Sequence, residues 1–147
     1  MVVLQKLAKG ARLLVKQLMT NPINHYKSTR HCAYSAKYHI VFCPKYRRKV
    51  LAEPIAIRFE SILKEVSGEL GVEVLELEVM PDHVHILVEI PPTVGIHTFV
   101  CRLKGRSSRL LREEFPELKK RLPCLWTNSY FCSTVGGAPL ELSLIHI

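Results

Sequence analysis

The chain has 147 residues, a length that fits one domain with a buried core and leaves little room for a second. Its 21 lysines and arginines exceed its 13 aspartates and glutamates, so the net charge is +8 and the pI about 9.4. This balance favours a polyanionic partner, nucleic acid ahead of an anionic membrane surface. No apolar run approaches the roughly 20 residues of a membrane span. Five scattered cysteines without a C-x-x-C pair indicate buried thiols of a reducing compartment and exclude a disulfide framework.

Residues 1–24 combine apolar side chains at helical spacing with lysines and an arginine on other faces. This pattern predicts a basic amphipathic helix. Thr20-Asn21-Pro22 ends it, and Met19 is an alternative start. We therefore interpret residues 1–24 as an N-terminal extension that stands apart from the domain.

The domain begins with a strand over residues 34–42, which are rich in aromatic and β-branched side chains. A loop over residues 43–49 follows, with one tyrosine among cations. Glu53-Pro54 then opens a helix with an apolar stripe, and Gly71 ends it. Residues 72–79 form the second strand.

The next stretch, residues 80–90, is a turn at Pro81-Asp82 followed by a strand with two histidines. Side chains alternate along a strand, so His83 and His85 share one face with Leu87 and Glu89. The short connection predicts an antiparallel hairpin with the preceding strand.

A second helix is expected over residues 95–115, with arginines recurring on a face away from its apolar stripe, and a last strand over residues 125–132. The order is strand, helix, strand, strand, helix, strand. It is the split βαβ order of an α+β, ferredoxin-like sandwich, in which helices cover one face of an antiparallel sheet.

Two kinds of site are suggested by these elements. His83 and His85 could offer two nitrogen ligands to one divalent ion, and Asp82, directly before them, is the best placed carboxylate to complete the site. The plainer alternative is a pair of histidines on a half-solvated sheet face.

Candidate nucleic-acid-binding residues lie in the loop, where an aromatic ring among cations suits stacked bases and phosphates, and on the basic ridge of the second helix. The alternative for the ridge is a solvated charged face. The candidates are Lys45, Tyr46, Arg47, Arg48, Arg102, Lys104, Arg106 and Arg109.

Taken together, several segments resemble the single-tyrosine HUH transposases of the insertion sequence 200/605 family. The matching segments are residues 38–42 with 45–48, residues 80–87 with both histidines, residues 103–108, and residues 126–131 with 134–137. The resemblance implies a transposase domain over residues 25–141. It also implies a cytoplasmic homodimer that binds single-stranded DNA hairpins and cuts and rejoins strands through a phosphotyrosine, with Mg²⁺ or Mn²⁺ on the two histidines.

In that family the nucleophilic tyrosine and a glutamine ligand lie on a helix after the Gly-Gly segment, and this sequence has no such helix. Residues 142–147 match a translated sequencing adaptor, so we interpret them as a non-native tail and expect this chain to be inactive. Tyr130 is the candidate substitute nucleophile, although it falls within a strand pattern.

Two other functions stay open. The first is a non-catalytic protein that binds single-stranded nucleic acid on the same fold. The second is a metal-dependent or nucleotide hydrolase. It is disfavoured because Leu87 takes the third position of a His-x-His-x-His pattern.

Overall fold

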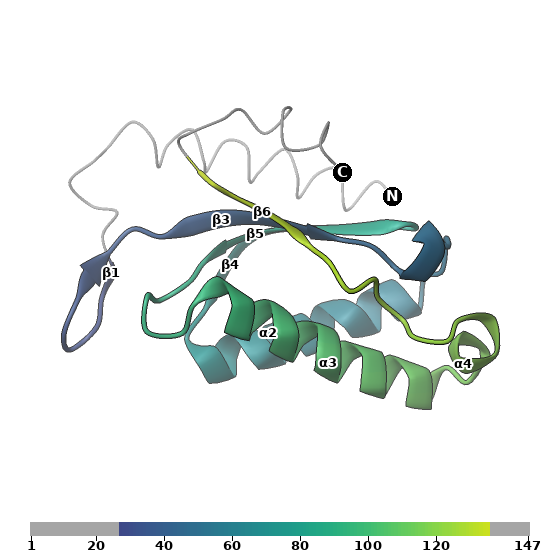
Figure 1. The fold of residues 1–147 in the computed structure, drawn as a ribbon. Helices are drawn as coiled ribbons and strands as arrows, with labels where there is room; N and C mark the ends of the chain where they lie inside the picture. The colour runs from purple at the N-terminus through teal and green to yellow at the C-terminus, as the bar shows by residue number, and fades with distance from the viewer. Residues whose placement is uncertain (1–26, 136–147) are drawn as a thin grey trace.

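The computed structural model describes residues 27–135, and the interpretations of residues 1–24 and 142–147 lie outside this range. One four-stranded sheet has the order β4-β5-β3-β6, with every neighbouring pair antiparallel. The strands are β3 (Lys37–Phe42), β4 (Glu73–Met80), β5 (His83–Glu89) and β6 (Phe131–Thr134). Helices α2 (Ile55–Leu70) and α3 (Ile96–Glu114) lie on one face of this sheet (Figure 1). This arrangement confirms the α+β, ferredoxin-like prediction.

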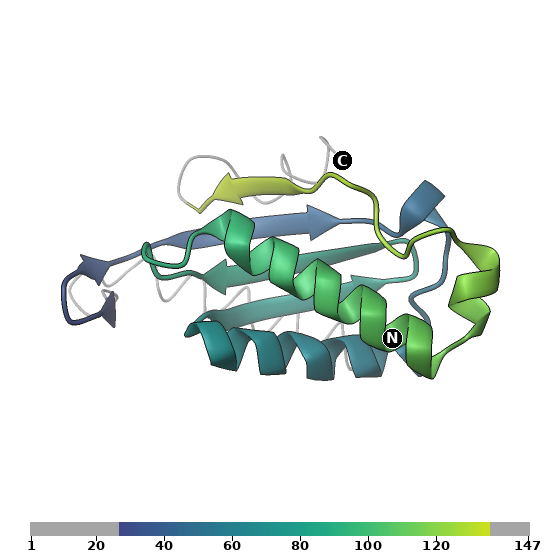
Figure 2. The same cartoon turned by 60° about the horizontal axis from the view of Figure 1, so that its bottom comes forward.

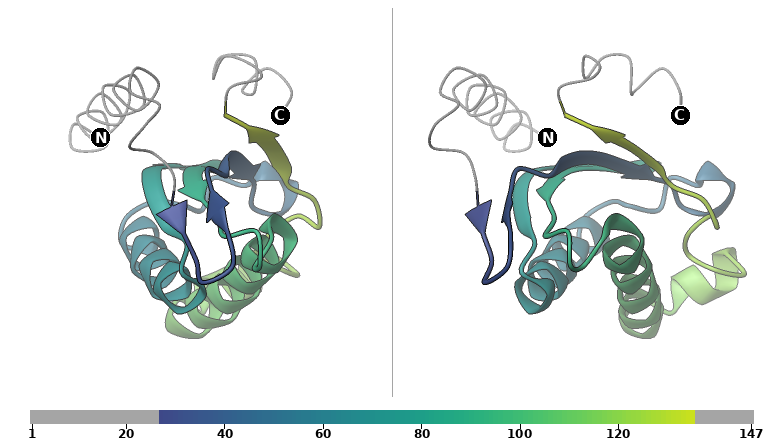
Figure 3. Two further views of the ribbon diagram at one scale, coloured as in Figure 1. Left: turned by 90° about the vertical axis from the view of Figure 1, so that its left-hand side faces the viewer. Right: turned by 60° about the vertical axis from the view of Figure 1, so that its left-hand side comes forward.

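Smaller elements lie at the two ends of the sheet. The hairpin of β1 (Lys27–Ser28) and β2 (Ala33–Tyr34) extends from one end, and α4 (Glu117–Arg121) lies at the other (Figure 2). Figure 3 shows the hairpin end-on, with both long helices below the sheet. Among the helices of the described residues, none is long and apolar enough to cross a membrane.

The core fills the space between the sheet and the two long helices. Alternate residues of the central strands point into it, as the period of two requires, and helical residues meet them at the spacing of one helix face. Gly71 ends α2 in the left-handed conformation, with φ of 68°, as the sequence predicts. The residues of this core include Ile40, Phe42, Phe59, Ile62, Val84, Ile86, Val88, Phe99 and Leu103.

The prediction of a last strand over residues 125–132 is wrong in its first part, because β6 begins only at Phe131. The side chain of Trp126 is instead buried in the core. Its indole N–H donates to Ser107 Oγ at 2.9 Å, and its ring lies 4.7 Å from that of Phe42. The expectation of buried thiols also fails: Cys101 and Cys132 are exposed, the other three cysteines are only partly buried, and all five are free.

Candidate functional site

The histidine strand β5 divides its side chains between the two faces of the sheet. Val84, Ile86 and Val88 belong to the core between the sheet and the helices. His83 and His85 alternate with them and therefore lie together on the opposite face. The strand thus holds the two imidazoles side by side at a fixed spacing.

The ring of His83 is held by the residue before it. His83 Nδ1 lies 2.8 Å from Asp82 Oδ1, and Arg47 Nη2 donates to Asp82 Oδ2 at 3.2 Å. The hydrogen bond from His83 and the nearby charge of Arg47 lower the pKa of Asp82. Asp82 therefore joins the histidine strand to the basic loop. From the sequence we predicted Asp82 as a metal ligand. In the structure one of its carboxylate oxygens contacts His83 and the other contacts Arg47.

His85 meets a third histidine that the sequence did not single out. His39 Nδ1, on the neighbouring strand β3, lies 3.1 Å from His85 Nε2, and each residue is 3% exposed. Burial lowers the pKa of both rings from 6.5 to about 4, helped at His39 by His85 and at His85 by His83. Both imidazoles are therefore neutral near pH 7.

Neutral imidazole is the form that binds a metal. The remaining ring nitrogens, Nε2 of His83 and Nδ1 of His85, make no hydrogen bond to residues 27–135. Within that range, no three His, Cys, Asp or Glu side chains come together to hold one ion. The described residues therefore offer two imidazole nitrogens, and a divalent ion bound here would need its other ligands from elsewhere.

The basic loop has an unusual backbone. Tyr46 and Arg47, in the short helix η2 (Lys45–Arg47), have φ of 60° and 50°. Such left-handed conformations are uncommon for residues other than glycine, and they cluster at functional sites. The Tyr46 side chain is 67% exposed, and Lys45 Nζ lies 5.6 Å from its ring centre. The loop thus presents an aromatic face and cations one residue from the contact with Asp82.

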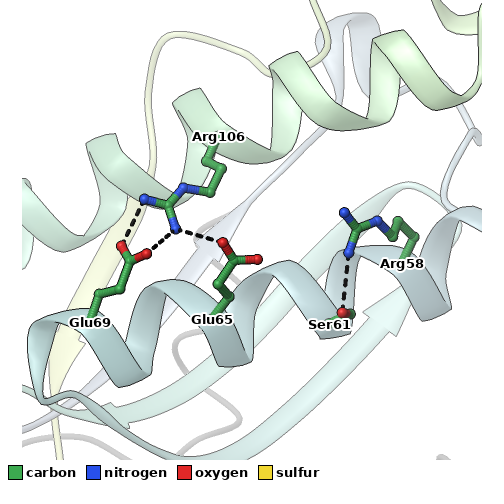
Figure 4. A network of polar contacts seen from close by, with 5 residues as sticks. All are labelled: Arg58, Ser61, Glu65, Glu69 and Arg106. Carbon is green, nitrogen blue, oxygen red and sulfur yellow. Dashed lines mark hydrogen bonds and ion pairs between the residues drawn. The ribbon is translucent and has the colours of Figure 1, made fainter.

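The predicted basic ridge of α3 has a different environment. Both terminal nitrogens of Arg106 donate to Glu69, at 2.8 and 2.7 Å, and one reaches Glu65 at 3.3 Å (Figure 4). Arg58 makes a second link between the helices, to Glu114 at 2.7 Å. These side chains join α2 to α3 in the helix layer, which lies on the opposite side of the sheet from His83 and His85.

Another predicted DNA-binding residue, Lys104, is also engaged within the protein. Its ammonium group donates to the carbonyl oxygens of Thr127 and Ser129, at 2.5 and 3.2 Å. It also lies 5.8 Å from the ring centre of Phe42, and burial lowers its pKa. Lys104 therefore holds the segment that leads into β6. Arg102 and Arg109 are exposed.

Tyr130, the candidate substitute nucleophile, lies on the side of the sheet that faces the helices. Its ring packs against the core, and its hydroxyl lies 3.1 Å from Nδ1 of His97 on α3. Burial raises the pKa of its phenol. The structure thus does not bring Tyr130 together with His83 and His85.

Comparison with known proteins supplies the family. Residues 32–145 match the family model described as "Transposase IS200 like". The ISDra2 transposase TnpA of Deinococcus radiodurans is 40% identical over 112 residues, which cover 75% of this chain and 80% of that protein. The transposase for insertion sequence element IS200 of Salmonella typhimurium is 41% identical over 112 residues, covering 75% of this chain and 74% of its own length.

Solved structures agree with this result. The crystal structure of a Deinococcus radiodurans R1 protein described as a transposase has a TM-score of 0.72 and 36% identity, and covers 82% of this chain and 92% of that one. A REP-associated tyrosine transposase bound to a REP hairpin has a TM-score of 0.56 and 12% identity, over 82% and 67% of the two chains, and supports the fold alone. The chain therefore belongs to the IS200-like transposase family.

Proposed function

We propose that this transposase binds hairpins of single-stranded DNA and that its histidine face serves in cutting and rejoining strands through a phosphotyrosine intermediate. The observation that carries the proposal is the contact of Arg47 with Asp82 and of Asp82 with His83. This contact joins the histidine strand, whose two imidazoles are the proposed metal ligands, to an exposed loop suited to nucleic acid.

His83 and His85 are the proposed holders of a divalent ion, either Mg²⁺ or Mn²⁺. Imidazole donors favour Mn²⁺ over the harder Mg²⁺, which prefers oxygen ligands. A bound ion would offset the negative charge that develops on phosphoryl oxygens. Asp82 accepts the hydrogen bond of His83 Nδ1–H and so keeps the lone pair on Nε2. We therefore assign Asp82 the role of orienting His83 instead of ligating the ion.

The proposed primary DNA contact is the loop, through Lys45, Tyr46, Arg47 and Arg48. An exposed aromatic ring can stack on an unpaired base, and the surrounding cations can contact phosphates. A related fold, that of the REP-associated tyrosine transposase, is bound to a hairpin. Arg102 and Arg109 could add long-range attraction, whereas Lys104 and Arg106 are engaged within the protein.

The nucleophile is a separate question. Since the Tyr130 hydroxyl contacts His97 on the helix side, we infer that Tyr130 does not attack the DNA. We propose that the attacking tyrosine comes from outside residues 27–135.

We also propose a homodimer. The sheet described here has two edge strands, β4 and β6, and edge strands are surfaces on which a second chain can pair. Light scattering tests the proposal, and a monodisperse monomer at working concentrations would contradict it.

A cleavage assay tests the proposed function. The substrate is single-stranded hairpin DNA from the flanks of the genomic locus, with Mn²⁺ or Mg²⁺, and the product is scored as a covalent protein–DNA adduct. This chain is compared with a version extended to the next natural stop codon. We expect an adduct from the extended version and its loss in His83→Ala.

Three other results would change the proposal. If the Tyr130→Phe variant of this chain forms an adduct and its Tyr26→Phe variant does not, the nucleophile is Tyr26. An adduct that disappears in Tyr130→Phe would contradict the assignment of Tyr130. DNA binding without an adduct in either version would favour a non-catalytic binding protein.

A further inference from the structure

We infer that His39 is a positioning residue: it accepts a hydrogen bond from His85 Nε2–H and so fixes the ring tautomer of His85. The inference deepens the proposed function, because that tautomer leaves the lone pair on Nδ1 of His85. It assigns a role to a histidine that has no partner at ligand spacing in the sequence.

The strand register places the two rings next to each other. His85 pairs with Val41 across β3 and β5, and His39 pairs with Leu87, so the two histidines are diagonal neighbours on one face. Their planes differ by only 9° and their centres are 5.2 Å apart, whereas the two nitrogens are 3.1 Å apart. The rings therefore meet edge to edge, in the geometry of an N–H···N hydrogen bond.

A hydrogen bond between two neutral imidazoles uses one proton, and its direction decides which nitrogen of His85 can bind a metal. If His85 Nε2–H donates, Nδ1 carries a lone pair. If His39 Nδ1–H donates, His85 carries its own proton on Nδ1 and cannot bind a metal there.

The first direction matches the arrangement at His83. There, a carboxylate oxygen of Asp82 accepts from Nδ1–H at 2.8 Å and leaves Nε2 free. Metal-binding histidines usually donate their second N–H to such an acceptor, which fixes the tautomer and the orientation of the ring. His39 would serve His85 as Asp82 serves His83.

A direct role for His39 as a ligand is the competing explanation. Two nitrogens 3.1 Å apart could also share one ion. Within residues 27–135, however, His39, His83 and His85 do not form a group of three around one point. The structure therefore favours the hydrogen bond.

The test uses the full chain with ¹⁵N-labelled histidine and no metal, so that it does not depend on the ion. Long-range ¹H–¹⁵N correlation spectra near pH 7 report which nitrogen of His85 carries the proton. We expect the Nε2–H tautomer in the wild type, a mixture of tautomers in His39→Leu, and recovery in His39→Asn, whose amide oxygen can replace the Nδ1 acceptor. In parallel, Mn²⁺ affinity should fall about tenfold in His39→Leu and recover in His39→Asn.

Several outcomes would overturn the inference. A wild-type His85 protonated on Nδ1 would do so without any variant, even if His39→Leu failed to fold. An unchanged tautomer and unchanged affinity in a folded His39→Leu would do so as well. Equal loss of affinity in both variants, with the tautomer of His85 intact, would make His39 a ligand. If the wild type binds no Mn²⁺, only the proposed metal function fails, because the tautomer is measured without metal.

Discussion

The loop at Lys45–Arg47 and helix α3 both carry several cations, and the structure engages those cations differently. The Arg47 side chain is 56% exposed and contacts one carboxylate, that of Asp82. The Arg106 side chain is 21% exposed and contacts two carboxylates on α2. A basic residue is more available to DNA when its side chain is exposed and fewer of the protein's own carboxylates and carbonyls engage it. The two regions therefore predict different responses to the same loss of charge.

The largest effect is expected on DNA affinity. The double variant Arg47→Gln with Arg48→Gln should weaken hairpin binding about tenfold at low salt. The slope of log binding constant against log salt concentration should become shallower by about 1.4, because each lost phosphate contact changes this slope by about 0.7. The matched control, Arg102→Gln with Arg106→Gln, removes the same charge from α3 and should cost much less. Fluorescence anisotropy across a salt series measures both. Equal losses in the two variants would remove the distinction between the regions.

For stability we expect the opposite contrast, with a larger effect from a cation of α3 than from a cation of the loop. Lys104→Met removes a half-buried ammonium group that holds the carbonyls of Thr127 and Ser129. We expect the free energy of unfolding to fall by about 1.5 to 3 kcal/mol, the usual range for hydrogen bonds from a charged donor. Lys45→Met, in the exposed loop, is the control and should change it little. Urea denaturation followed by circular dichroism measures the difference, and an unchanged midpoint for Lys104→Met would contradict the structural role.

The histidine face predicts a pH dependence that the ion pairs of the helix layer do not share. The pKa values of His39 and His85 fall from 6.5 to about 4 on folding. Between these two pH values the unfolded chain binds protons that the folded chain excludes. The contribution of the two histidines to the free energy of unfolding is therefore fully present above pH 6.5 and is lost as the pH falls toward 4. His39→Asn should reduce the slope of the free energy of unfolding against pH by the equivalent of up to one proton. Urea titrations at pH 7, 6 and 5 would show it, and identical slopes for both proteins would argue against a buried neutral pair.

The smallest effect is expected at Arg106. Arg106→Gln breaks the contacts with Glu65 and Glu69, which are exposed enough to be weakened by salt. The melting temperature should drop slightly at low salt and less at high salt, with DNA affinity preserved. Arg109→Gln, at an exposed arginine of the same helix, is the control and should leave the melting temperature unchanged. A loss of DNA affinity without a thermal effect would return Arg106 to the DNA interface.

Much of the fold could be predicted because its patterns are local. The period of two in β5 and the helical stripes of α2 and α3 depend on neighbouring residues, and Gly71 marks a helix end by its own conformational freedom. The start of β6 was missed because the core captures Trp126 through Ser107, which is distant in the sequence. Tertiary contacts there override a strand pattern.

The site was predicted only in part for the same reason. His83 and His85 are two residues apart, so their shared face follows from the strand alone. His39 is 46 residues from His85, and its role depends on the register of β3 against β5, which one sequence does not determine. Side chains alternate along the strand predicted over residues 34–42, which puts His39 on the face away from Ile40, and this alternation was the available signal. The partners of Lys104 and Arg106 likewise come from distant segments.

Binding of Mn²⁺ in the absence of DNA tests the central claim most directly. Titration of the wild type, followed by electron paramagnetic resonance of the free ion, should give one site per chain. His83→Ala and His85→Ala should each weaken that site at least tenfold, and His31→Ala, at an exposed histidine between β1 and β2, should leave it unchanged. A wild type that binds no Mn²⁺, or one whose affinity survives both substitutions, would contradict a metal site on this face.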